Sequence, residues 1–320
     1  MAFHMKLAKS QISHSGLHTE LRGIGKKIWK YRAYYVLMLP AIIYVAIFCY
    51  GPMYGIQIAF KDFKPVLGYD GSPWVGLKHF INFFGGANFW RLIRNTLYIT
   101  TYSLIVGFPI PIILALLLNE VKEKVRKPVQ TILYAPHFIS VVVMVGILNL
   151  VFSPTFGIVN NVIEMLGGER TYFMVEPSAF RHIYVWSGIW QKMGWNAVIY
   201  IAALSTVDEE LHEAARIDGA SRLQRIWYIN IPTILPTILI LLIMQIGSIA
   251  SVGYEKIYLL QNDLNVEVAE VISTYVYKRG IVNTNYSFST AVGLFNNLIN
   301  VLFLFVANFF AKKTTDTSLF

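Results

Sequence analysis

Long stretches without a charged residue are the feature that most constrains this sequence. Five of them lack Asp, Glu, Lys and Arg, and they cover residues 33–60, 95–119, 128–163, 226–254 and 281–311. A sixth, 182–207, is interrupted only by Lys192. A helix needs about 20 apolar residues to cross a bilayer, and each stretch is longer than that. The chain is therefore predicted to cross a membrane several times.

We predict an all-α membrane protein with six transmembrane helices. The Ser153-Pro154 pair should end the third helix, while Pro232 and Pro236 suit the beginning of the fifth. Only 14% of the 320 residues are charged, against about 25% in soluble domains, which excludes a soluble enzyme. The predicted spans lie near 34–58, 96–118, 130–152, 183–204, 233–254 and 288–311.

Basic residues predict the orientation of the chain. With the N-terminus inside, the inner segments carry 16 Lys or Arg in 68 residues and the outer segments carry 10 in 78. Cytoplasmic loops are richer in these residues, so both termini are expected inside, although Arg91 and Arg94 count against this orientation. We expect a cytoplasmic segment 1–32, a transmembrane domain 33–311 whose first helix is retained rather than cleaved, and a cytoplasmic tail 312–320.

The sequence lacks the motifs of an ATPase, a hydrolase or a metal site. Residues 23–27, Gly-Ile-Gly-Lys-Lys, come nearest to a phosphate-binding loop but lack its first Gly and its Ser/Thr. Cys49 is the only cysteine, so no intrachain disulfide can form. His137, inside a predicted span, is expected to be a helix-end residue bonded to backbone or water. We expect no catalytic residue, metal or cofactor on this chain, and any ATP that drives it must bind another chain.

The predicted inner loop at 205–232 encodes a short helix, a break and a second helix. Thr206 followed by Glu209 fits a capping box, and Gly219 can adopt the left-handed conformation that closes a helix. Ser221 followed by Gln224 is a second capping box, which restarts a helix. The result is a rigid projection joined to a transmembrane helix.

This loop resembles the permease signature of ATP-binding-cassette (ABC) importers. The signature has Glu-Ala-Ala, three residues, Gly, nine residues and Ile-x-Leu-Pro. Here Ile231 replaces Leu, and the matching positions are Glu213, Ala214, Ala215, Gly219, Ile229 and Pro232, with Asp218-Gly219-Ala220 as a further match. The segments Trp74-Val75-Gly76-Leu77 and Tyr134-Ala135-Pro136 resemble sugar-importer permeases, and the subgroup resembled is that of complex-oligosaccharide permeases such as the alginate importer.

The resemblance implies a larger assembly in a bacterial plasma membrane. Two permease chains, here a heterodimer, form the path, and two ATPase subunits use ATP and Mg in the cytoplasm. An extracytoplasmic binding protein delivers the substrate. The helix around Glu213–Ile217 would insert in a groove on one ATPase, so that ATP-driven closure switches the permease between inward-facing and outward-facing states. The net charge of +9 is assigned to cytoplasmic loops, not to nucleic-acid binding.

A polar stripe in the fourth predicted span is a candidate substrate path. Gly188, Lys192, Asn196 and Tyr200 recur every four residues, with Trp195 beside them. Charged residues within spans face a cavity or a partner, and this set could hold a sugar, including a carboxylated one such as alginate. The alternatives are that Lys192 extends to the outer interface or pairs with an acid.

The fifth predicted span has a similar polar edge. It contains Gln245, Ser248 and Ser251, with Tyr254 nearby, and Asn149 is a weaker candidate in the third span. Small polar residues also pack helices against one another in membranes, so this edge has two interpretations.

The leading hypothesis is a permease subunit for oligosaccharide import. The alternatives are a permease for another solute, such as glycerol phosphate, and a membrane scaffold or sensor without transport.

Overall fold

The computed structural model describes residues 29–315 and falls into two compact units, divided after Gln57. Within the described residues the regular structure is helical, apart from an isolated bridge between Lys61 and Trp74. Most of the predicted segment 1–32 and the end of the tail 312–320 lie outside the described residues.

The first unit contains one long apolar helical segment. Helix α2 (Arg32–Tyr44) passes into η1 (Val45–Tyr50) and then into η2 (Gly51–Phe60), which crosses the unit boundary. Residues 32–60 form a helix long and apolar enough to cross a membrane, in agreement with the first predicted span. No residue of α2 is buried, and a helix with apolar residues on all sides suits a lipid or protein environment.

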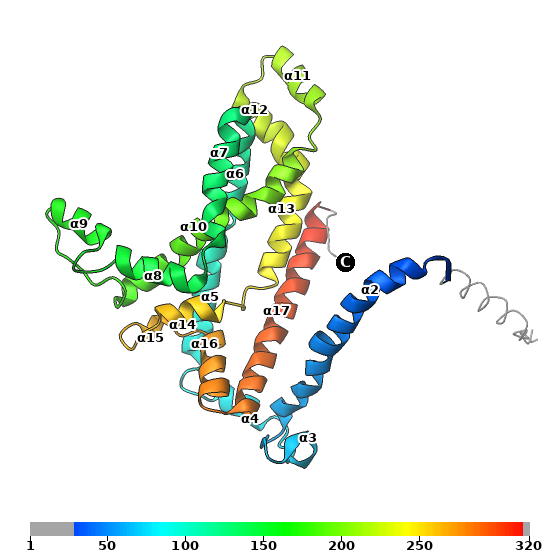
Figure 1. Cartoon of the computed structure of the whole chain (residues 1–320), viewed down its shortest axis with the longest axis vertical. Coiled ribbons are helices and arrows are strands. Elements are labelled where there is room, and N and C mark those ends of the chain that lie inside the picture. Colours follow the sequence, from blue (N-terminus) through cyan, green and yellow to red (C-terminus); the bar gives the residue numbers. More distant parts are fainter. Residues whose placement is uncertain (1–28, 316–320) are drawn as a thin grey trace, which may run out of the picture. The chain divides into compact units, whose positions relative to one another are not determined.

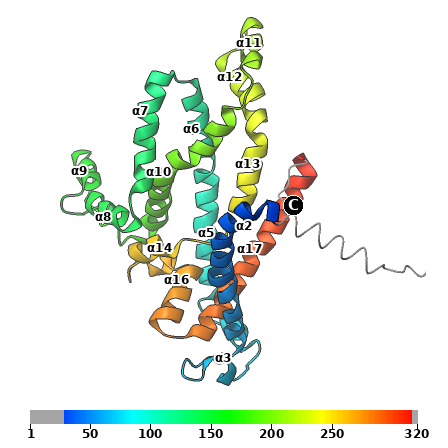
Figure 2. The ribbon, with the colours of Figure 1, turned by 45° about the vertical axis from the view of Figure 1, so that its right-hand side comes forward.

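The second unit is built around α10 (Pro177–Leu204), as Figures 1 and 2 show. Helix α10 packs on three helices that precede it in the sequence, α5 (Phe89–Gly107), α6 (Pro109–Glu120) and α7 (Glu123–Tyr134). It also packs on α13 (Ile231–Ile246), which follows it. The remaining elements are α3 (Gly68–Gly71), α4 (Lys78–Phe84), η3 (Ala135–Phe138), α8 (Val141–Val151), α9 (Ile158–Met165), α11 (Glu209–Ile217), α12 (Arg222–Arg225), η4 (Ile226–Asn230), α14 (Tyr254–Leu260), α15 (Val266–Ala269), α16 (Ile272–Tyr277), η5 (Lys278–Val282) and α17 (Tyr286–Thr315).

Four helical segments of the described chain are long and apolar enough to cross a membrane, or five if a bent pair counts as one span. The single segments are Arg32–Phe60, Phe89–Glu120, Arg222–Ile246 and Tyr286–Lys313. The 28 residues of α10 would extend about 42 Å, but α10 is not among the apolar segments and much of it is buried by its neighbours.

The third predicted span is not a straight helix. Its two halves, Glu123–Phe138 and Val141–Val151, meet at an angle of 100°. The extended backbone of Ser140 breaks the helix, and its hydroxyl caps α8 by accepting from the Val143 amide at 3.3 Å. The Ile139 carbonyl accepts from Gln191 Nε2 at 2.7 Å. The expectation of a continuous helix over 130–152 was therefore wrong, because capping and a tertiary contact stabilise the break.

The fifth predicted span is displaced toward the N-terminus. Its helix begins at Arg222, before Pro232, and ends at Ile246 rather than near residue 254. Residues 247–253 are not helical, and the chain becomes helical again at Tyr254.

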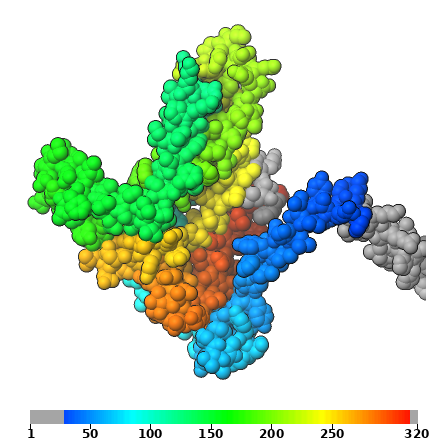
Figure 3. Space-filling model, in the orientation of Figure 1, coloured from blue at the N-terminus to red at the C-terminus, as the bar shows by residue number. Residues whose placement is uncertain are grey.

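The ends of the second unit separate the predicted inner and outer segments. In Figures 1 and 2 the α6–α7 connection lies at the same end as α11 and α12, whereas α3, α4 and α16 lie at the opposite end. This grouping agrees with the predicted sides of those segments, whereas α9, which leads into a predicted outer segment, lies between the two ends. Figure 3 shows α9 and its flanking loops (green) as a projecting arm.

Polar contacts order the α9 arm. The buried Asn160 side chain donates to the carbonyls of Ser153 at 3.0 Å and Thr171 at 2.9 Å, and accepts from the Thr171 amide at 2.8 Å. Arg170 binds Glu164 at 2.6 Å, and this hydrogen bond and charge lower the pKa of the Glu164 carboxyl. The arm is therefore a folded element rather than an open loop.

The two arginines that counted against the orientation lie at the start of α5. Arg91 Nη2 lies 2.7 Å from Glu270 Oε2, and Lys278 Nζ lies 3.4 Å from Glu270 Oε1. The Glu270 side chain is only 9% exposed. Arg91 is thus neutralised by a buried acid, which explains how it is accommodated on the predicted outer side; Arg94 has no such explanation.

Replacing Glu270 with alanine is expected to lower the free energy of unfolding by about 2 kcal/mol, because Arg91 and Lys278, which are 30% and 33% exposed, lose their shared partner. Glu123→Ala is the matched control, since Glu123 pairs with Lys127 at 2.8 Å while 66% exposed, and it should cost less than about 0.5 kcal/mol. Unfolding in mixed micelles measures both variants. Equal losses would contradict a special contribution from the buried acid.

Candidate functional site

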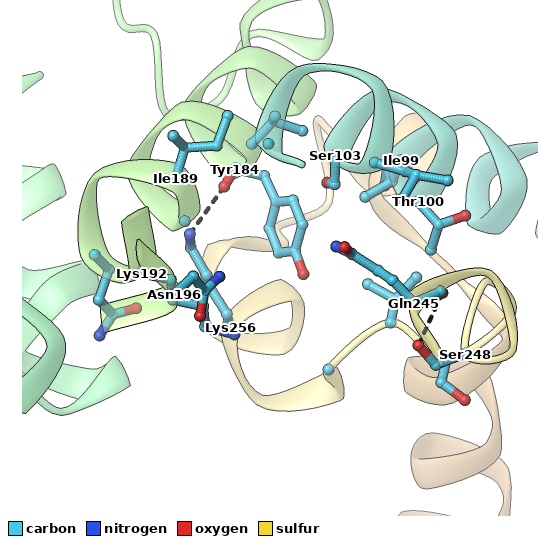
Figure 4. Close-up of a pocket in the computed structure, with 18 of the residues that line it drawn as sticks. Ile99, Thr100, Ser103, Tyr184, Ile189, Lys192, Asn196, Gln245, Ser248 and Lys256 are labelled. Atoms are coloured by element: carbon cyan, nitrogen blue, oxygen red, sulfur yellow. Dashed lines mark hydrogen bonds between the residues drawn. The ribbon is translucent and has the colours of Figure 1, made fainter. Parts of the chain in front are cut away.

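A cavity of about 420 Å³ opens between α5, α10 and the non-helical segment after α13 (Figure 4). Side-chain amides, hydroxyls, a carboxylate and ammonium groups share its wall with aliphatic side chains. Its polar lining includes Thr100, Ser103, Gln191, Lys192, Asn196, Gln245, Ser248, Ser251, Glu255 and Lys256. Such a mixture is suited to a hydroxyl-rich ligand.

The two polar edges expected from the sequence face this one cavity. Gly188, Lys192 and Asn196 contribute from α10. Gln245, Ser248 and Ser251 contribute from the end of α13 and the segment after it. Figure 4 shows Lys192 and Asn196 on one side and Gln245 and Ser248 on the other. Residues about 50 positions apart in the chain are therefore brought together.

Four other expected path residues lie outside the cavity lining. Trp195 stacks on His137, with centroids 4.5 Å apart and planes 4° apart, so His137 has an aromatic partner. Tyr200 is buried in a core cluster with Ala115 and Ile234. Tyr254 stacks on Tyr277 with centroids 5.1 Å apart, and Asn149 is exposed on α8.

The non-helical wall of the cavity is held by α17. Asn300 Oδ1 accepts from the Ala250 amide at 2.8 Å, and Asn300 Nδ2 donates to Ser251 Oγ at 2.6 Å. Non-helical backbone at membrane depth is tolerated only inside protein or beside a water-filled space, because lipid cannot hydrogen-bond to it. The break after Ile246 therefore indicates that this segment is covered by protein or lines the cavity and does not face lipid.

Sequence analysis missed Tyr184, Glu255 and Lys256, which also line the cavity. Glu255 and Lys256 end the charge-free stretch and were assigned to an outer segment. The signal that could have included them is the density of Gly and Ser between Gly247 and Gly253, which argues against a continuous helix there.

The loop between α10 and α13 has the expected helix–break–helix form. Helix α11 begins at Glu209, and Asp208 Oδ1 caps it by accepting from the Glu210 amide at 3.0 Å. Thr206 instead bonds back to the Ala203 carbonyl at 2.8 Å. The expected Thr206–Glu209 capping box was therefore wrong. The N-cap is Asp208, two residues after Thr206, because this Asp lies next to the first turn of the helix.

The break itself is as expected. Gly219 has φ +78°, in the left-handed region, and the Ala220 amide donates to the Ala215 carbonyl at 2.8 Å. The capping box of the next helix is present, since the Ser221 amide donates to Gln224 Oε1 at 2.7 Å while Ser221 Oγ accepts from the Gln224 amide at 3.4 Å. Both local predictions are confirmed.

The face that α11 presents is available to another protein. Glu213, Ala214 and Asp218 are exposed, and Ile217 is 87% exposed. Ile229 is half-buried and Pro232 is exposed at the base of the loop, where η4 joins α13. The projection therefore exposes Glu213, Ala214 and Asp218 at its surface, while its base continues into a helix long enough to span a membrane.

A family model matches residues 107–316, about two thirds of the chain, and describes the binding-protein-dependent transport system inner membrane component. The chain belongs to this family. It is thus a permease of the ABC importer class and, with its apolar helices, a multi-pass inner membrane protein. The matched range includes α10, the α11 loop and the cavity wall apart from its α5 residues before Gly107.

Close relatives agree with this assignment. Protein LplB of Bacillus subtilis is 45% identical over 89% of this chain and 90% of its own length. The polygalacturonan/rhamnogalacturonan transport system permease protein YteP, also of Bacillus subtilis, is 43% identical over 92% of both chains. In the crystal structure of a bacterial alginate ABC transporter in complex with an alginate pentasaccharide-bound periplasmic protein, one chain is similar with 41% identity and a TM-score of 0.84, covering 92% of this chain and 99% of that one.

Proposed function

We propose that this chain forms, with a second permease, the membrane path for uptake of an oligosaccharide delivered by an extracytoplasmic binding protein. The observation that carries the proposal is the convergence of two polar edges on one cavity beside a broken span. Interrupted helices that place irregular backbone around a cavity are typical of transport sites. The transport names of YteP and of the alginate structure support a sugar oligomer as the cargo.

The proposed topology has six spans, with α10 and the bent α7–α8 pair added to the four single segments. Helix α10 is less apolar because its polar side faces the cavity. Both termini would lie in the cytoplasm, and so would the α11 loop. This arrangement places the arm around α9 and the α14–α16 region on the side from which the binding protein delivers substrate.

The chain would perform no covalent chemistry itself. Two partner ATPase subunits would use ATP and Mg, and one would receive α11 through Glu213, Ala214 and Ala215. The residues Asp218, Gly219 and Ala220 would fix the break, while Ile229 and Pro232 would join it to α13. Closure of the ATPases would move the projection as a rigid body and change the side to which the cavity opens, because ATP binds the two states with different affinity.

Within the cavity, Gly188, Lys192, Asn196, Gln245, Ser248 and Ser251 are the proposed contacts for the substrate. Amides and hydroxyls can exchange hydrogen bonds with sugar hydroxyls, and water can bridge those that do not meet directly. Trp195, Tyr200, Tyr254 and Asn149, which lie elsewhere, would affect transport through packing.

Reconstitution tests the proposal. The chain, its partner permease, the ATPase and the binding protein are placed in proteoliposomes, and uptake of oligosaccharides is measured with and without ATP. We expect uptake only when all components and ATP are present. Uptake of glycerol phosphate in place of sugars would favour the other solute class, and an assembly that moves neither class would indicate a scaffold or sensor.

A further inference from the structure

A buried lysine stands in the cavity wall. Lys256 is only 9% exposed, yet it lines the cavity. Its Nζ donates to the Tyr184 carbonyl at 2.8 Å, the bond drawn in Figure 4, and lies 4.8 Å from the centroid of the Tyr184 ring. An ammonium group has three donors, so two are left for another acceptor.

No carboxylate forms an ion pair with Lys256 in the part of the chain that the structure describes. Glu255 also lines the cavity but is exposed and makes none of these ion pairs, while Lys192 adds a second positive charge. A buried charge without an opposite charge is costly, because its lost hydration is not replaced. An anionic ligand in the cavity would provide the missing partner.

Gly188, one turn after Tyr184 on α10, leaves space beside the ammonium group. A Cβ atom at Gly188 would stand 3.3 Å from Lys256 Nζ, so the glycine keeps the ammonium uncovered from this side. The neutral polar residues Asn196, Gln245 and Ser248 line the same space. The cavity thus combines the buried Lys256, a second cation at Lys192, the exposed carboxylate of Glu255 and neutral hydrogen-bonding groups. The buried group is the cation, and a sugar that carries a carboxylate would pair with it.

We propose that Lys256, on α14 and packed against Tyr184 of α10, determines substrate specificity by receiving the carboxylate of an acidic oligosaccharide, such as a uronic acid oligomer. The proposal rests on the proposed oligosaccharide path. Lys256 supplies charge as well as a donor, so it distinguishes acidic from neutral sugars of the same shape.

The test uses the complete transporter in proteoliposomes with two matched probes. One probe is a set of oligogalacturonates and alginate oligomers, and the other is the same oligomers with their carboxyl groups reduced to alcohols. Three variants separate charge from hydrogen bonding. Lys256→Met removes both, Lys256→Gln keeps a donor without charge, and Lys256→Arg keeps the charge.

We expect Lys256→Met and Lys256→Gln each to lower the ratio of acidic to neutral uptake at least about tenfold relative to the unmodified chain, since a hydrogen-bonded charge contact typically contributes this much. Lys256→Arg should keep the ratio within about threefold. Assembly with the ATPase, measured by co-purification, should not change in any variant.

Other outcomes overturn the proposal. If acidic and neutral uptake fall together, Lys256 only holds α14 against Tyr184. If the unmodified transporter carries only neutral oligomers, or if Lys256→Met leaves the ratio unchanged, the acidic specificity is wrong while the oligosaccharide path stands. If the unmodified assembly carries neither probe, the proposed function itself fails and the role of Lys256 falls with it.

Discussion

Replacing Gly219 with valine is expected to reduce ATP-driven uptake at least about tenfold. Gly219 has φ +78°, and a Cβ atom added at this position would meet no other atom within 4 Å, so the penalty comes from the backbone and not from a clash. A β-branched residue strongly disfavours this conformation. The chain would leave α11 in a different direction, and α11 would no longer be held in a fixed position relative to α13.

Gly219→Asn is the matched control, because Asn tolerates the left-handed region far better than Val. It should keep uptake within about threefold of the unmodified chain. ATP hydrolysis stimulated by the loaded binding protein should also be highest in the unmodified chain, slightly lower in Gly219→Asn and lowest in Gly219→Val, because coupling between ATPase and permease works in both directions. If Val and Asn have equal and small effects, the conformation at the break is not required for coupling.

Replacing Gly194 with alanine is expected to lower the free energy of unfolding by about 3 kcal/mol, the upper end of the usual cost of overpacking. Gly194 lies on α10 where it meets α7, and its Cβ would collide with the carbonyl oxygen of Leu133. A backbone carbonyl cannot move aside as a flexible side chain can, so the two helices would have to separate. Small residues commonly permit such close helix contacts in membranes.

Gly146→Ala serves as its control, because no atom lies within 4 Å of a Cβ at this position in α8. Alanine there should be neutral or slightly stabilising, since it is the better helix former. The yield of monodisperse protein and its Tm in detergent measure both variants. If Gly194→Ala purifies with an unchanged Tm, α7 and α10 do not pack as closely as described.

Local signals predicted much of this fold because local physics determines it. The charge-free stretches gave the positions of the apolar helices, and the Ser221 cap and the Gly219 break depend on only a few neighbouring residues. The bend near Ser140 was missed because part of its stabilisation comes from Gln191, about 50 residues away. The end of α13 was missed because Asn300 of α17 replaces the hydrogen bonds that a continuing helix would make.

The stripe on α10 shows what periodicity could predict about the site. Steps of four residues advance about 40° per step around a helix of 3.6 residues per turn. Tyr200 is therefore turned about 120° from Gly188, which takes it from the cavity into the core with Ile234. Sequence alone could place Lys192 and Asn196 near one face, but which neighbour covers that face is decided by tertiary packing.

The charge at Lys256 could not be placed from sequence, for a physical reason. Read along the chain, Glu255-Lys256 marks the end of an apolar stretch and so the start of an outer loop. In three dimensions the non-helical segment after Ile246 turns α14 back against Tyr184, and the lysine becomes part of the cavity wall. The Gly and Ser residues between Gly247 and Gly253 indicate a break in the helix, but no local pattern encodes the direction in which the chain returns.

The central claim is that the cavity is a water-filled path whose opening is switched by the partner ATPase. The accessibility of a cysteine at position 248, in the cavity wall, tests it most directly. Ser248→Cys is made in a chain whose only cysteine, Cys49, has been changed to serine. Leu298→Cys in the same background, on the exposed apolar side of α17, is the control. We predict that a membrane-impermeant thiol reagent labels position 248 from one side of the membrane without ATP and from the other side with ATP trapped, and does not label position 298 in either state. Labelling of position 248 that is absent in both states, or that does not change sides with ATP, would contradict the account.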